Sequence, residues 1–420
     1  MTVEITPGIN LTVVPTQKFK TTQITWRFLA PLTARNLNQR SLLAAVLENS
    51  SERYQTPKEL NELLADLYGA TFGVDVLRRG NVHEIAFTLN VVNDKFLGAH
   101  DESILAKAFD FLAEVMFYPA LTGRKFDVTI VEREKQHLLS NLAALMEDKQ
   151  DYALVKLQEQ YYNEPAQAYP FYGNADEIKN INEHDLYNVY QDMMTNNLMS
   201  IIVVGDLHEK DVIPLIQRYQ LKERPKVTLD YFYKQPLKQE VGVQTEQDNV
   251  VQAKLSMMYQ TNIYFGQELY YSLLVCNGLF GGFPHSKLFM NIREKASLAY
   301  YASSYVDAYR GTLAVQSGIA TENKDQVIKL VEEQLAALTR GDFTDEELKQ
   351  TKAMLIGQYL NRLDIPQALK EQAVIQQTFK DLKFTTETYV DSIEHVTREM
   401  VIEVAKQIKL QNIYCLEGSE

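Results

Sequence analysis

Ser200-Ile-Ile-Val-Val-Gly-Asp206 is the stretch that decides the fold, because a related stretch lies near the end of the chain. Its short apolar run ends in a Gly-Asp turn and predicts a buried strand. Ile413-Tyr-Cys-Leu416 has the same character and lies 212 residues further on. A helical pattern leads to each strand, from Ile181 in the first case and from Val396 in the second. One repeat of this length indicates a duplicated domain rather than a solenoid.

The other patterns follow the same order in both halves. In the first half, Thr56-Pro57-Lys58-Glu59 is a capping box that opens a helix ending near Gly69. The other elements expected there are strands at 22–29 and 84–92 and helices at about 40–53, 102–117 and 126–148. In the second half we expect strands at 251–259, 298–306 and 312–320, and helices at about 266–277, 285–295, 323–339, 344–360 and 366–379.

This mixture of strand runs and helical runs predicts an α+β fold. We expect two homologous α+β domains, each with a mixed or antiparallel sheet packed by helices. The polar segment from Leu221 to Gln244 contains Pro225 and Pro236 and is interpreted as the linker. The predicted division is therefore a first domain at 1–222, a linker at 223–245 and a second domain at 246–420.

Composition excludes several functional classes. The chain has 420 residues, of which 45% are hydrophobic and 23% charged, as in globular proteins of two or three domains. A formal net charge of −13 argues against binding to nucleic acid or to anionic lipid. Cys276 and Cys415 are interpreted as buried free thiols in a reducing compartment. The first residues lack the pattern of a signal peptide, so we expect a cytosolic protein.

The strongest local signal lies in the second half. Asn277-Gly-Leu-Phe-Gly-Gly-Phe-Pro-His-Ser-Lys-Leu-Phe289 is a glycine-rich segment, and Ile292-Arg-Glu-Lys-Ala-Ser-Leu-Ala-Tyr300 follows it. Together with Val203-Val-Gly-Asp206 and Phe343-Thr-Asp-Glu-Glu-Leu348, these segments resemble the pitrilysin or insulinase-like (M16-type) metallopeptidases. The resemblance covers nearly the whole chain and is strongest to half-length subunits without metal, the YmfF-like group. Ser297 stands where the family has glycine.

The resemblance implies a zinc motif, His-x-x-Glu-His, on the helix at 40–53, and a distant glutamate as third ligand. Residues at i and i+4 share one helical face and can grip one metal ion, and the intervening glutamate reaches the metal-bound water. In this chain the two histidine positions are Ala45 and Asn49, and the glutamate is Glu48. The third ligand position is Ser140 or Asn141. We therefore expect no metal and no catalysis on this chain alone.

The second half keeps the residues that the resemblance assigns to substrate. Arg293 and Tyr300 match an arginine and a tyrosine that bind substrate and stabilise the tetrahedral intermediate at zinc. A guanidinium fork and a phenol O–H are both donors suited to developing negative charge. Both the lining of a substrate chamber and a structural turn remain open for the glycine segment, with Gly278, Gly281 and Gly282 as its candidate contacts.

Other short motifs in the chain resemble metal or phosphate sites but do not match them fully. His83-Glu84 and His208-Glu209 lack a second histidine four residues on, so neither is an ordinary zinc-peptidase helix. Glu134-x-x-His137 has di-iron spacing but lacks a second copy. The glycine segment lacks the Gly-Lys-Ser/Thr ending of a phosphate loop. Glu48 could be an ordinary surface residue of its helix.

Two functional hypotheses follow from the resemblance. In the first, the chain is the non-catalytic subunit of a heterodimeric zinc peptidase, with zinc in a sister subunit that carries His-x-x-Glu-His, and with a peptide as substrate. In the second, it is a non-proteolytic scaffold or peptide-binding protein with a vestigial chamber. We expect no nucleic acid and no membrane as partners, and a homodimer is possible when the chain is expressed alone.

Overall fold

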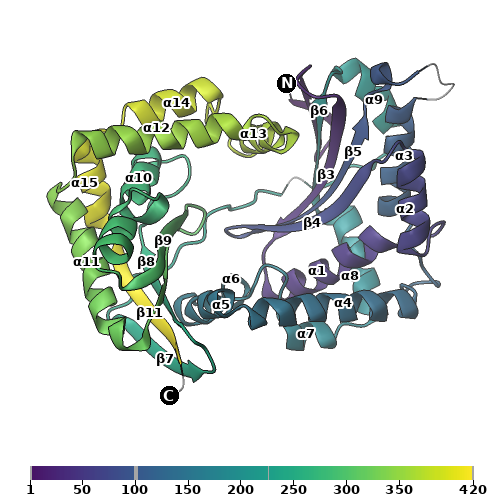
Figure 1. Cartoon of the computed structure of the whole chain (residues 1–420). Helices are drawn as coiled ribbons and strands as arrows, with labels where there is room; N and C mark the ends of the chain where they lie inside the picture. The colour runs from purple at the N-terminus through teal and green to yellow at the C-terminus, as the bar shows by residue number, and fades with distance from the viewer. Residues whose placement is uncertain (1, 99–102, 226, 419–420) are drawn as a thin grey trace. The chain divides into compact units, whose positions relative to one another are not determined.

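The computed structural model describes residues 2–98, 103–225 and 227–418. It divides into two compact units, each built on one β-sheet with helices (Figure 1). The first unit contains the chain up to Leu142, Pro170–Asp230 and Arg362–Leu382. The second contains Ala143–Tyr169, Tyr231–Asn361 and Lys383 onward. The α+β class expected from the sequence is confirmed.

The sheet of the first unit has the strand order β1-β2-β6-β3-β5-β4. Only β2 and β6 pair in parallel, and the other neighbours are antiparallel. Trp26 and Phe28 on β3 are fully buried in its core, where helices of the same unit cover them. The strands are β1 Thr2–Thr6, β2 Ile9–Pro15, β3 Thr21–Pro31, β4 Thr71–Arg79, β5 Val82–Val92 and β6 Leu198–Gly205.

The sheet of the second unit repeats this topology without the first strand. Its order is β7-β11-β8-β10-β9, and β7 and β11 form the parallel pair. The order matches that of β2, β6, β3, β5 and β4, so the duplication inferred from Ile201 and Ile413 holds at the level of strand pairing. The strands are β7 Gly242–Asp248, β8 Ala253–Gln260, β9 Ala299–Asp307, β10 Thr312–Ile319 and β11 Lys409–Gly418.

Helices cover both sheets. Those of the first unit are α1 Ala34–Asn49, α2 Pro57–Asp66, α3 Ile104–Phe117, α4 Val128–Glu147 (whose last residues belong to the second unit), α7 Ala175–Lys179, α8 Glu183–Asn196 and α9 Glu209–Gln217. Those of the second are α10 Tyr270–Asn277, α11 Lys324–Arg340, α12 Asp345–Arg362, α14 Thr386–Glu394, α15 Arg398–Gln407 and the π-helices Gly278–Gly282 and Phe289–Lys295. No helix among the described residues combines the length and apolar character needed to cross a membrane.

Each half of the chain gives one helix to the sheet of the other half. Helix α5 (Lys149–Tyr161), followed by the short α6 (Pro165–Ala168), packs on β8 and β11 of the second unit. Helix α13 (Pro366–Thr378) packs on β2 and β6 of the first. The predicted domain boundaries at 222 and 246 follow the sequence duplication and stay a prediction. The compact units differ from that division, because α5 belongs to the second unit and α13 to the first.

A buried group of charges lies where α13 meets the first sheet. Arg27 on β3 donates two hydrogen bonds to the Glu84 carboxylate on β5, at 2.6 and 2.7 Å, and both side chains are at most 2% exposed. Burial alone would raise the pKa of Glu84, but Arg27, Arg79 and Lys370 lower it to about 2. Lys370 comes from α13 and is itself buried. The exchanged helix therefore brings a positive charge to this carboxylate.

Several predicted elements differ from the structure, including α1, which ends at Asn49 rather than near 53, and α10, which begins at Tyr270 rather than near 266. Helix α1 begins at Ala34, six residues before the predicted start, because Thr33 and Asn36 form a capping box. The helix expected at 285–295 is mostly a π-helix from Phe289, and the glycine segment is helical as well. Strand β7 begins at Gly242, inside the segment interpreted as a linker.

Candidate functional site

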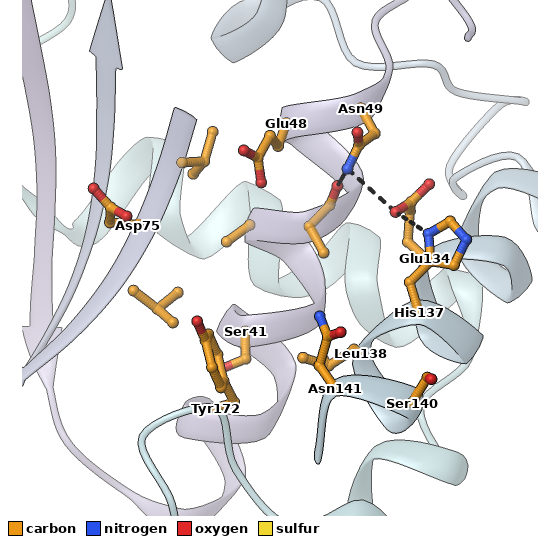
Figure 2. Close-up of a pocket in the computed structure, with 14 residues that line it drawn as sticks. Ser41, Glu48, Asn49, Asp75, Glu134, His137, Leu138, Ser140, Asn141 and Tyr172 are labelled. Atoms are coloured by element: carbon orange, nitrogen blue, oxygen red, sulfur yellow. Dashed lines mark hydrogen bonds and ion pairs between the residues drawn. The ribbon is translucent and has the colours of Figure 1, made fainter. Parts of the chain in front are cut away.

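The positions of the degenerate zinc motif meet in one pocket of the first unit. This pocket has a volume of about 590 Å³ and is lined by α1, β4, α4 and the loop at Tyr172 (Figure 2). Positions far apart in the sequence therefore come together as the resemblance implies. The lining residues are Ser41, Ala44, Ala45, Glu48, Asn49, Val74, Asp75, Val76, Glu134, His137, Leu138, Ser140, Asn141 and Tyr172.

Helix α1 presents Ala45, Glu48 and Asn49 from its last turns, and its position is set by contacts away from them. Arg40, one turn earlier and 2% exposed, donates from Nε to His83 Nδ1 at 2.9 Å and from Nη2 to the Phe28 carbonyl at 2.8 Å. These bonds tie the helix to β5 and β3. No metal is needed to hold this face of α1 against the sheet.

The side chains at the two histidine positions do not fit zinc. Ala45 offers only a methyl group, and Asn49 Nδ2 donates to the Ala45 carbonyl at 3.0 Å and to Glu134 Oε2 at 3.2 Å. The Glu134 carboxylate also accepts from Arg133 and lies 3.2 Å from His137 Nδ1. Among the described residues, no three His, Cys, Asp or Glu side chains gather closely enough to hold a metal ion.

The two candidates for the third ligand position both line the pocket but face differently. Figure 2 shows the Asn141 side chain pointing toward α1, whereas Ser140 points away from it. Both residues are exposed on α4. The facing side chain makes Asn141 the position from which a longer acidic residue could reach Ala45 and Asn49.

Glu48 keeps its carboxyl group in an unfavourable environment. Partial burial raises its pKa most, and the nearby carboxylates of Asp75 and Glu134 raise it further, while a hydrogen bond from the Val74 backbone acts in the opposite direction. Among the described residues, no ligand set for a metal surrounds this carboxyl group. Glu48 and Asp75 therefore give this part of the pocket a negative charge.

Sequence reasoning did not single out Asp75 and Tyr172, and it considered Glu134 and His137 only as a di-iron spacing rather than as residues of this pocket. Asp75 lies on β4, an edge strand that we did not predict, although Thr71–Arg79 alternates apolar and polar residues over Phe72, Val74 and Val76. That alternation could have predicted the strand that carries Asp75. Tyr172 lies in a loop, and nothing in its local sequence points to the pocket.

Arg293 and Tyr300 lie in the second unit, on consecutive elements. The Arg293 guanidinium sits 4.6 Å from the centre of the Phe289 ring and 3.6 Å from the Glu294 carboxylate. Tyr300 lies on β9, an edge strand, and is 75% exposed. Both side chains are open to solvent and thus accessible to a ligand, and their role with substrate stays a prediction.

Close packing accounts for two of the three glycines. A Cβ added to Gly278 would lie 2.5 Å from Thr351 Cγ2, and one added to Gly281 would lie 2.8 Å from the Ser304 backbone nitrogen. Gly282 is exposed. The glycine segment is thus a tightly packed π-helix against β9, and its contact with substrate remains untested.

The remaining candidates have structural partners. His83 is buried and accepts from Arg40, and His208 begins α9. Glu134 and His137 contact each other but have no further ligands for a metal within the described chain. Cys276 and Cys415 are buried free thiols, as expected.

Residues 180–355 match a family model described as "Peptidase M16 inactive domain". The chain is 36% identical to a Bacillus subtilis protein named probable inactive metalloprotease YmfF, over 98% of this chain and 96% of that protein. The chain belongs to the M16 peptidase family. A crystal structure of a conserved protein from Enterococcus faecalis has a TM-score of 0.95, with 38% identity over 100% of this chain and 98% of that one.

More distant M16 structures share the fold. The peptidase M16 inactive domain from Pseudomonas fluorescens has a TM-score of 0.83 with 18% identity, and the alignment covers 100% of this chain and 98% of that one. The family model and the relative at 36% identity confirm the recognition made from the glycine segment and from Arg293 to Tyr300.

We expect the pocket to bind zinc once its ligands are restored. The triple variant Ala45→His/Asn49→His/Asn141→Glu should hold about one zinc ion per chain, because two imidazoles on one helical face and a facing carboxylate form a common zinc site. Elemental analysis of the purified protein measures this. The parent chain and Ala45→His/Asn49→His/Ser140→Glu, with the acid on the averted position, should hold far less, and equal zinc in both triple variants would contradict the geometry.

Glu48→Gln should stabilise the chain in a pH-dependent manner. A raised pKa means that the folded chain binds the proton more tightly, so the charged form is unfavourable to folding above the usual glutamate pKa of about 4.3. The gain in the free energy of unfolding should be present near neutral pH and disappear as the pH falls below that value. Denaturant unfolding at several pH values measures it, and Glu52→Gln, at an exposed site, is the control. A gain that grows on acidification would contradict the assigned environment.

Ser297→Gly should also stabilise the chain. Ser297 has φ of +55°, in the left-handed region, at the end of the π-helix that carries Arg293. In this region a residue with a Cβ is strained by about 1–2 kcal/mol. Glycine removes this strain, but its greater conformational freedom in the unfolded chain offsets part of the gain. We expect a net gain of roughly 0.5–1 kcal/mol in the free energy of unfolding. Ser303→Gly, within β9, should instead destabilise, and a loss at both positions would refute the argument.

Proposed function

We propose that this chain is the zinc-free subunit of a heterodimeric M16-type peptidase in the cytosol. In this proposal a sister subunit with an intact His-x-x-Glu-His motif holds the zinc. The present chain supplies Arg293 and Tyr300 to the peptide being cut. Relatives in Bacillus subtilis support the pairing of such chains, because one is named an inactive metalloprotease and another an uncharacterized zinc protease.

The exposed Tyr300 is the observation that carries the proposal. A tyrosine 75% exposed on an edge strand contributes little to the core, so packing gives no reason for this residue. Its hydroxyl can donate to an oxyanion. Arg293 is near it in sequence and keeps an open guanidinium face beside Phe289. The absence of a metal ligand set in the pocket is consistent with catalysis at another subunit.

The role of each donor is electrostatic. The sister's zinc site would supply the activated water, and a fixed donor from this chain would stabilise the negative charge that develops on the attacked carbonyl more than it stabilises the ground state. The Arg293 fork can in addition hold the peptide backbone. Both groups would therefore affect turnover without touching zinc binding.

Tyr300→Phe is the test of this proposal. In the complex of the two subunits, the variant should lower kcat on the order of 10²–10³, or about 2.7–4 kcal/mol, because one oxyanion donor is lost while the ring remains. Zinc content of the sister and assembly of the heterodimer should not change. Tyr305→Phe, which removes a hydroxyl from the same strand, is the matched control.

Two other outcomes would change the conclusion. Full turnover by an assembled Tyr300→Phe complex would remove the catalytic role, and the chain would then be a scaffold or peptide-binding protein. Chelator-sensitive cleavage by this chain without any partner would refute its assignment as the non-catalytic subunit.

A further inference from the structure

The pocket around Glu48 has an aromatic rim, formed by Tyr172, which lines the pocket, and by Phe171, which packs against Tyr172. Phe171 and Tyr172 lie against each other with ring centres 3.9 Å apart and remain 43% and 36% exposed. Tyr172 lines the pocket, and Figure 2 shows its hydroxyl pointing into the same space as Glu48 and Asp75. Exposed aromatic side chains at the edge of a cavity are typical of binding sites.

The rim is fixed in place by α1. The backbone nitrogen of Asn174 donates to Asn38 Oδ1 at 2.6 Å. Gly173 has φ of +106°, and a Cβ there would overlap the Asn38 side chain. Asn38 also donates to Glu177 on α7 at 2.5 Å. The loop that carries the aromatic pair is therefore anchored to the helix that carries Glu48, and the two sides of the pocket keep a defined separation.

The charge inside the rim is negative and lacks a counter-ion. Glu48 and Asp75 both act electrostatically on Tyr172, and no Lys or Arg is among the described residues that line the pocket. The backbone of Asp75 pairs with Ala86 in the sheet, but among the described residues its side-chain carboxylate has no hydrogen bond or ion pair. Lys370 acts on Asp75 from outside the pocket, but it is buried and also interacts with Glu84 and Glu371. A positive ligand would therefore gain attraction that this part of the chain does not satisfy internally.

The arrangement suits an organic cation better than a metal ion. No three metal-ligating side chains gather among the described residues, whereas an aromatic face beside carboxylates attracts ammonium and guanidinium groups. A guanidinium is planar and weakly hydrated, so it can lie against a ring and donate to carboxylates at once. The volume of about 590 Å³ exceeds what one such side chain needs. The exposed Asn141 side chain on α4 can meet the rest of a peptide.

We propose that the aromatic-rimmed pocket of Glu48, Asp75 and Tyr172 binds the side chain of an arginine in a peptide. The proposal rests on the proposed function for the nature of the ligand, a peptide. It assigns to this chain a specificity of its own, separate from the Arg293 and Tyr300 pair in the second unit. Peptides that contain an arginine would thus be held at the positions that the resemblance assigns to a zinc site.

Binding of short peptides to the purified chain alone tests this inference. The probes are two acetylated, amidated pentapeptides that differ only at the central residue, arginine in one and citrulline in the other. Citrulline keeps the shape and removes the charge. Because hydrogen bonds to charged groups contribute about 1.5–3 kcal/mol, we expect the arginine peptide to bind at least about tenfold more tightly by isothermal titration calorimetry.

The matched variants locate the preference. Glu48→Gln/Asp75→Asn keeps the shape of the pocket and should abolish the preference for arginine, and Tyr172→Leu should reduce it. Glu52→Gln removes an exposed charge outside the pocket and should leave it unchanged. Thermal unfolding confirms that each variant is folded, and the charge-removing variant should be no less stable than the parent, since it relieves repulsion.

Four results would overturn the inference. Three of them are equal binding of the two peptides, a preference for arginine that survives Glu48→Gln/Asp75→Asn, and a failure of both peptides to bind. A lysine peptide that binds more tightly than the arginine peptide would replace the ligand by an ammonium group and would also refute the proposal as stated. The test of the proposed function measures turnover by the two-subunit complex, whereas this one measures binding by a single chain, so the two failures can be told apart.

Discussion

The buried ion pair between Arg27 and Glu84 is the interaction on which the first unit depends. Both charges lie in the middle of the sheet, where leaving either one unpaired would cost about 3–5 kcal/mol. The pair is covered by α13, which adds the Lys370 charge and, through Glu371, binds Arg79 at the end of β4 at 2.6 Å. Because α13 belongs to the second half of the sequence, the first sheet and the pocket wall on β4 are completed only when both halves are present.

Contacts within the chain also hold the walls of the pocket in place. Helix α1 is held by its Thr33 cap and by the Arg40 bonds to His83 and Phe28, all of them away from Ala45 and Asn49. Burial lowers the pKa of Arg40 to about 9, so the guanidinium remains charged and bound at neutral pH. The Asn49 amide on α1 donates to Glu134 on α4 and so joins the two helices. The motif positions that the resemblance implies therefore stay together through contacts within the chain.

The sequence predicted local features well and long-range features poorly. The capping box at Thr56, the strand at 84–92 and the duplication around Ile201 were all readable from periodicity and turn residues, and each is confirmed. The packing of α5 and α13 on the sheet of the opposite half could not be predicted, because no local sequence pattern indicates which sheet a helix will cover. The start of α1 was missed because its capping box uses Asn36, where Glu or Gln is the usual signal. For the third ligand position, the sequence left Ser140 and Asn141 equivalent, and only the direction of the α4 face separates them.

In the pocket, the ability to coordinate a metal and the negative charge depend on different residues. Histidines at the positions of Ala45 and Asn49 would be neutral ligands, so their presence or absence changes what the pocket can coordinate but not the sign of its charge. Glu48 and Asp75 remain, and their mutual repulsion can be relieved only by protonating Glu48, whose pKa is raised, or by a positive ligand. Near neutral pH a positive ligand gains from both carboxylates at once. A cavity whose described residues offer no ligand set for a metal would thus still favour positive charge, and the ring of Tyr172 beside the carboxylates suits the organic cation proposed above.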